Sequence, residues 1–88
     1  MTKQAYEQDV AKEIRKQREA LGLTQAWLAQ AVGTSAATVS RWEKGERRVG
    51  LYAHKRIKVL FRQEREAQAA ANRAAVNGAA VNGAAVTR

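Results

Sequence analysis

The chain has 88 residues and a formal net charge of +8, from 16 Lys and Arg against 8 Asp and Glu. It contains no Cys, which excludes a disulfide scaffold and a thiolate metal site. No apolar run approaches the roughly 20 residues of a membrane span. The length of the chain predicts one small domain. The charge is concentrated between residues 41 and 62, where eight bases stand against two acids. A polyanion is the natural partner of such a segment, although a solvated basic face has the same composition.

The first predicted helix runs from about Gln8 to Leu21. Val10 and Ile14 lie near one stripe with Leu21 at helical spacing, and Gly22 is placed to end the helix. Acidic side chains crowd its expected start, where the helix dipole favours them: Glu7, Asp9 and Glu13.

Two short helices are predicted next, over about residues 25–32 and 36–44. Thr24 offers an N-cap to the first, and Ser35 or Thr34 offers one to the second. Gly33 separates the two helices and Gly45 ends the second. The apolar residues form one inner side on each helix: Leu28, Ala29 and Val32 on the first, Val39 and Trp42 on the second.

A fourth helix is predicted from Leu51 to about Ala71. One stripe along it carries Ala53, Ile57, Leu60, Phe61 and Glu64. The second half of this helix has no large apolar residue, which predicts a frayed or solvent-exposed extension. Residues 72–88 repeat an Asn-Gly-Ala-Ala-Val unit, and each Gly costs a helix about 1 kcal/mol against Ala. We therefore expect a disordered tail there, whose repeat reflects DNA-level duplication or a weak tether through Arg73 and Arg88.

Two short helices joined by a glycine-bearing turn can set the second of them into the major groove of DNA. The first helix would bring Gln25 near a phosphate, although Gln25 could also be a plain exposed polar residue. On the second helix, Arg41 is the one outer side chain that can make bidentate contact to guanine. It could equally hold a phosphate or pair with Glu46. Ala36 and Ala37 can contact only a thymine methyl or permit close backbone approach.

This stretch resembles the helix-turn-helix of the phage Cro and repressor type, the XRE family. The resemblance covers about residues 10–60 and rests on these pieces: Ile14-Arg15, Arg18-Glu19, Leu21-Gly22-Leu23-Thr24-Gln25, Leu28-Ala29, Val32-Gly33, Thr38-Val39-Ser40-Arg41-Trp42-Glu43 and Gly45. It implies an all-α, lambda-repressor-like compact bundle of four or five helices. It also implies a phage or prokaryotic transcription regulator, such as a repressor, that binds double-stranded DNA operators, often as a dimer.

The resemblance also implies roles for individual residues. Arg18 and Glu43 match a structural ion pair between helices. The residues expected to meet DNA are Thr24, Gln25, Ser35, Ala36, Ala37, Ser40, Arg41, Lys44, Arg47 and Arg48. The corresponding division of the chain is an N-terminal arm (1–8), a DNA-binding domain (9–66) and a low-complexity tail (67–88).

Three features depart from the family pattern. The two alanines are poor in polar readout, which shifts specificity to Arg41 and to DNA shape. Trp27 stands where a polar residue is usual; it packs at a helix edge, joins a protein interface or is neutral. The loop after Gly45 lacks the common proline. The basic residues around it could extend the phosphate footprint or simply be solvated: Arg47, Arg48, Lys55 and Arg56.

The sequence thus favours a sequence-specific regulator that docks residues 35–44 in the major groove. The alternatives are an antitoxin-like or adaptor protein-interaction module, and a low-specificity DNA binder. A homodimer is possible, and Leu51, Tyr52 and Val59 are the best candidates for its interface. We expect no catalysis, cofactor, metal, small-molecule ligand or membrane association, because His54 has no ligand partners at metal spacing and no nucleophile-base pattern occurs. A cytoplasmic protein, nucleoid-associated when bound to DNA, is expected.

Overall fold

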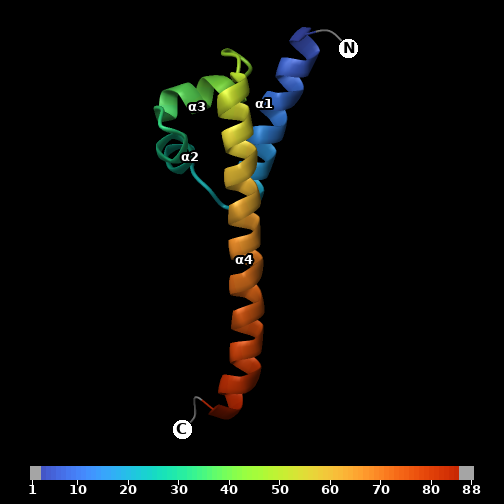
Figure 1. Ribbon diagram of the computed structural model, residues 1–88, viewed down its shortest axis with the longest axis vertical. Coiled ribbons are helices and arrows are strands. Elements are labelled where there is room, and N and C mark those ends of the chain that lie inside the picture. The colour runs from blue at the N-terminus through green and yellow to red at the C-terminus, as the bar shows by residue number, and fades with distance from the viewer. Residues whose placement is uncertain (1–2, 86–88) are drawn as a thin grey trace.

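The structure, a computed structural model, describes the backbone of residues 3–85 and the side chains of residues 7–76. Over this range the chain forms four helices and no strand: α1 (Lys3–Ala20), α2 (Gln25–Val32), α3 (Ala36–Glu43) and α4 (Leu51–Ala85). Helices α1, α2 and α3 gather beside the first half of α4, and the second half of α4 extends beyond them (Figure 1). The predicted all-α fold class is confirmed.

The two short helices begin at N-cap residues that the sequence predicted. The Oγ1 atom of Thr24 accepts a hydrogen bond from the backbone N–H of Trp27 at 2.9 Å. The Oγ atom of Ser35, and not Thr34, caps α3 by accepting from the backbone N–H of Thr38 at 3.1 Å. These bonds satisfy N–H groups that would otherwise lack partners in the first turn of each helix.

The core lies between the four helices and is built from one face of each. Its buried side chains are all at most 6% exposed: Ile14, Leu28, Ala29, Val39, Trp42, Ile57 and Phe61. Helices of eight residues are not stable alone in water, so the burial of these faces holds α2 and α3 in place. Trp27 is half-buried and packs against this core, which agrees with the edge-packing interpretation of that residue.

The start of α1 differs from the prediction. The sequence placed it near Gln8 and treated residues 1–8 as an arm, but α1 already begins at Lys3. The acids Glu7 and Asp9 consequently lie beyond the first turn, so their predicted place at the start of the helix was wrong. No Gly or Pro interrupts residues 3–8, and helix-forming side chains continue the helix backwards. Residues 1–2 of the predicted arm lie outside the described residues.

The end of α4 also differs from the prediction. The sequence ended this helix near Ala71, whereas the structure continues it to Ala85, because the alanines favour helix strongly enough to pass Gly78 and Gly83. The side chains of residues 69–76 are exposed, as expected for an extension without large apolar residues. Because no packing contact supports these exposed side chains, intrinsic helix propensity alone stabilises this stretch. It is therefore the part of α4 that unfolds at the least cost in free energy. Residues 86–88 of the predicted tail, with Arg88, lie outside the described residues.

Candidate nucleic-acid interface

The turn between α2 and α3 fixes how the two helices meet. Gly33 adopts a left-handed φ of 89°, and its N–H donates to the carbonyl of Ala29 at 2.8 Å. The N–H of Thr34 donates to the same carbonyl, also at 2.8 Å. Below the turn, Leu28 and Val39 are both 0% exposed. The chain therefore reverses at one defined angle, which a helix-turn-helix requires.

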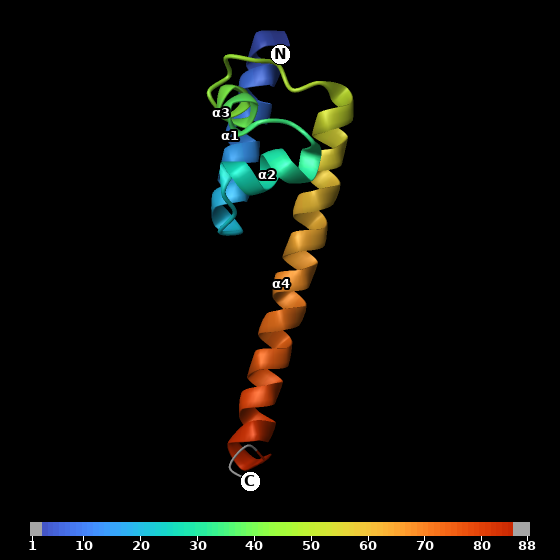
Figure 2. The same cartoon turned by 90° about the vertical axis from the view of Figure 1, so that its left-hand side faces the viewer.

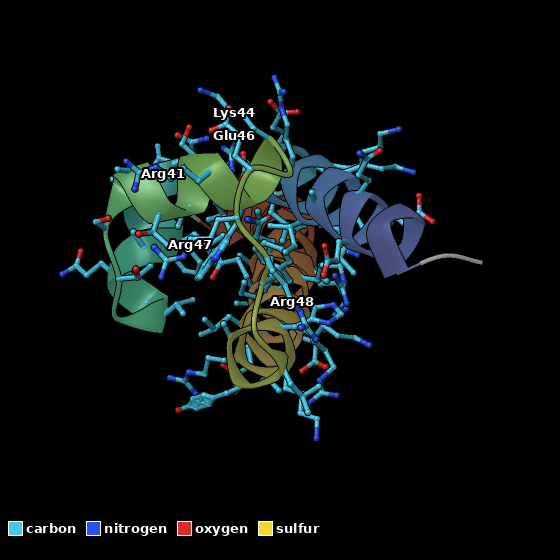
Figure 3. The ribbon with its side chains drawn as sticks, turned by 90° about the horizontal axis from the view of Figure 1, so that it is seen from above. Arg41, Lys44, Glu46, Arg47 and Arg48 are labelled. Carbon is cyan, nitrogen blue, oxygen red and sulfur yellow. The ribbon has the colours of Figure 1, made fainter. Side chains whose placement is uncertain are left out.

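The outer side of α3 carries small or basic residues and faces solvent. Its exposed members are Ser35, Ala36, Ala37, Arg41 and Lys44, with Ser40 half-buried beside them. Seen from above, Arg41 and Lys44 lie on the side of α3 that points away from α4 (Figure 3). The structure therefore brings most of the predicted base-reading residues together on one accessible helix face.

Arg41 is the largest donor group on this face. The ion pairs among the side chains of residues 7–76 do not include it, so the pairing with Glu46 considered from the sequence does not form there. Glu46 instead donates its backbone N–H to the carbonyl of Arg41 at 2.9 Å. The guanidinium of Arg41 is thus available to an incoming ligand.

The inner side of α3 is locked to α1 by Arg18 and Glu43. The guanidinium of Arg18 donates from Nε to Oε2 of Glu43 at 2.7 Å and from Nη2 to Oε1 at 3.0 Å. The Glu43 side chain is 2% exposed. The hydrogen bond to Glu43 is the main cause that raises the pKa of Arg18 above its ordinary value. A third bond, from Nη1 of Arg18 to the carbonyl of Leu23 at 2.7 Å, ties the loop before α2 to the same group.

Gln25 joins this network, which sequence reasoning did not foresee. Its Nε2 donates to Oε1 of Glu43 at 3.0 Å, so the half-buried amide is oriented by the carboxylate. An amide nitrogen carries two hydrogens, and one remains for a phosphate oxygen. Thr24, next to it, is exposed, and its hydroxyl keeps a hydrogen to donate while its oxygen caps α2. No sequence pattern could reveal the Gln25–Glu43 contact, because it depends on how α2 and α3 pack.

The basic residues after α3 separate into two positions. Lys44 stays with Arg41 on the outer side of α3, whereas Arg47 and Arg48 lie toward α4 (Figure 3). All three side chains are exposed. Arg48 Nε lies 3.5 Å from Oε1 of Glu7, which holds it toward α1. The structure therefore does not align Arg48 with the outer face of α3.

Other kinds of site find less support in the described part of the chain. His54 is half-buried, and burial together with nearby Lys58 lowers its pKa. Among the side chains of residues 7–76, no three His, Cys, Asp or Glu residues cluster as metal ligands would. Within residues 3–85, none of the helices has the length and apolar character needed to span a membrane.

Comparison with known proteins agrees with this geometry. A model of the helix-turn-helix family matches residues 14–51, from the middle of α1 to the first residue of α4. No curated protein and no solved structure matches the chain significantly. The family is one of DNA-binding regulator domains and not of enzymes. Residues 14–51 therefore form a helix-turn-helix, as the resemblance to the Cro and repressor (XRE) type predicted.

Proposed function

We propose that the protein is a sequence-specific transcription regulator that places α3 in the major groove of double-stranded DNA. The observation that carries this proposal is the exposed guanidinium of Arg41 on a helix whose opposite side is locked in the core. A rigid helix with one free forked donor can meet the O6 and N7 atoms of a guanine. Such a regulator acts in the cytoplasm, on the nucleoid.

The base-reading set is small. Arg41 supplies the strongest discrimination, and Ser40 adds one hydroxyl that can donate or accept. Ala36 and Ala37 bring no hydrogen-bonding side chain, but their small size lets the start of α3 approach thymine methyl groups closely. Part of the specificity then comes from the shape and deformability of the site.

Phosphate contacts would come from both ends of the motif. At the start of α2, Thr24 and Gln25 offer donors beside the free N–H groups of the first helical turn. Ser35 holds the same place at the start of α3, and Lys44 offers an ammonium at its end. Arg47 and Arg48, both exposed, add positive charge from the loop that follows α3. These groups set the position of α3 and supply much of the affinity without reading sequence.

In-vitro selection of bound fragments from random DNA tests the proposal, followed by affinity measurements with Arg41→Ala. We expect an enriched site, and a loss of about 1–3 kcal/mol on that site with a weaker preference over random DNA. Lys16→Ala, which removes one exposed charge from α1, is the matched control and should keep the preference. Equal binding of the enriched and random DNA by the parent protein would support the low-specificity alternative. Ala36 and Ala37 favour that alternative because they bring no hydrogen-bonding side chain.

The symmetry of the selected site tests the oligomeric state. A homodimer places two copies of α3 in successive major grooves, so its site consists of two inverted halves about one helical turn apart. A single unpaired half-site would indicate that one copy binds alone.

A further inference from the structure

The start of α4 exposes apolar side chains that the core does not use. Leu51 is 68% exposed and Tyr52 is 75% exposed. Together with half-buried Val59 they line one shallow depression, whose other walls are Lys55 and Arg56. These five residues, which we call the α4 patch, follow one another at helical spacing on one side of the helix. The other side of the same turns is filled by the core.

The α4 patch is basic as well as apolar. Residues 51–62 contain four Lys and Arg and no Asp or Glu. The ion pairs among the side chains of residues 7–76 include none of these four bases. The surface therefore offers exposed apolar groups beside positive charges that no acid neutralises in the described part of the chain.

We infer that the α4 patch is a docking surface for a protein segment that carries acidic and apolar side chains on one face of a helix. The apolar groups of such a segment would cover Leu51, Tyr52 and Val59, while its carboxylates would reach Lys55 and Arg56. An amphipathic helix in a hydrophobic groove is an established mode of recognition, with anchors spaced by three or four residues. Complementary charge adds specificity and speeds the encounter.

Charge argues against a second copy of the chain on this surface. Across a two-fold axis through the α4 patch, Lys55 and Arg56 would meet the same two residues of the other copy. Like charges brought together at an interface cost several kcal/mol. The proposal thus replaces the homodimer contact that the sequence suggested for Leu51, Tyr52 and Val59 with a contact to an acidic partner.

Nucleic acid and membranes fit the α4 patch less well. Phosphates would satisfy Lys55 and Arg56 but would leave Leu51 and Tyr52 exposed. A membrane-surface helix buries a broad apolar face, whereas the broad apolar face of α4 is already occupied, with Ile57 1% and Phe61 2% exposed.

The position of the α4 patch allows simultaneous binding of DNA. Helix α3 and the start of α4 lie on opposite sides of the body (Figure 2). Arg41 and Lys44 point away from α4 (Figure 3). A duplex on the outer face of α3 would leave the α4 patch open, and this step alone depends on the proposed function.

Selection from a display library of random peptides of about 15 residues, four helical turns, tests the inference on the full chain. The enriched peptides should be acidic, with apolar residues at helical spacing. Tyr52→Ser and Lys55→Glu should each weaken their binding about tenfold or more. Lys16→Glu makes the same charge change on an exposed part of α1 and should leave binding unchanged. Arg41→Ala should also leave it unchanged, which separates this result from a failure of DNA binding.

Four outcomes would overturn the inference. The first is enrichment of no peptide, or of peptides without acids. The second is peptide binding that survives both α4 substitutions. The third is displacement of the peptides by duplex DNA, which would make Lys55 and Arg56 phosphate contacts. The fourth is self-association in sedimentation velocity that Tyr52→Ser abolishes, which would assign the surface to a second copy.

Discussion

Arg18 and Glu43 lie 25 residues apart and form a two-pronged ion pair, with nitrogen–oxygen distances of 2.7 and 3.0 Å. The pair joins α1 to the last turn of α3, the helix that carries Arg41. Because Gln25 also donates to Glu43, a single carboxylate is shared by α1, α2 and α3. The orientation of α3 therefore depends on one buried acid.

Removing one partner of this pair should destabilise the fold strongly. Glu43→Ala leaves the guanidinium of Arg18 without its carboxylate in a buried position. We expect a loss of about 3–5 kcal/mol in the free energy of unfolding, measured by urea denaturation. The double variant Arg18→Met with Glu43→Leu should recover most of that loss, since it leaves no unpaired charge. A double variant as unstable as the single one would show that the hydrogen bonds to Leu23 and Gln25 matter more.

Gly33→Ala should destabilise the protein through the backbone alone. The φ of 89° at Gly33 is unfavourable for a residue with a Cβ, although no atom within 4 Å would meet that Cβ. We expect a loss of about 1–2 kcal/mol. Gly50→Ala is the matched control, because Gly50 has equal open space and no left-handed φ, and it should change stability little or raise it. Equal effects of the two substitutions in thermal unfolding would contradict this account.

Gln68→Ala should loosen α4 from the end of α1. The Nε2 atom of Gln68 donates to the carbonyl of Leu21 at 2.8 Å, and that carbonyl lies just past the end of α1. We expect a loss of about 0.5–1.5 kcal/mol. The exposed Gln63 offers the same substitution without the contact, so Gln63→Ala controls for helix propensity. Hydrogen exchange in the last turn of α1 should rise in the first variant and stay constant in the second.

His54 should make the protein less stable in mild acid. Its pKa in the folded protein is lowered from 6.5 by burial and by Lys58, so the unfolded chain binds the proton more readily. Where the unfolded state holds more protons, stability rises with pH. The free energy of unfolding should therefore fall as pH drops below about 6.5, until His54 is protonated in the folded state as well. In a pH series of urea titrations, His54→Gln should remove this part of the dependence. An unchanged profile would assign the dependence to the carboxylates.

The middle of the fold could be predicted from the sequence, and its ends could not. The bounds of α2 and the cap of α3 follow from Thr24, Ser35 and Gly33, which act on their own neighbours. The start of α1 and the end of α4 were not placed from such signals. Helix propensity changes gradually there, so a boundary placed from sequence shifts by several residues.

The candidate site shows the same division. The position of Arg41 on the outer face of α3 followed from periodicity, and the partner of Arg18 followed from a family resemblance. The contact of Gln25 with Glu43 and the separation of Arg48 from Arg41 depend on packing between helices and on the loop path. Local pattern carries no information about either. The roles of these residues toward DNA remain predictions that the selection experiment tests.

The course of α4 carries its second half away from α1, α2 and α3 (Figure 1). Gln68 is tied to the end of α1, and the helix continues from there to Ala85. At 1.5 Å per residue this places residue 85 about 25 Å farther along the helix axis. A fluorophore, solid support or second protein attached near that point would stand clear of the surface that α3 presents. Immobilisation through this end should therefore leave the outer face of α3 accessible to a duplex.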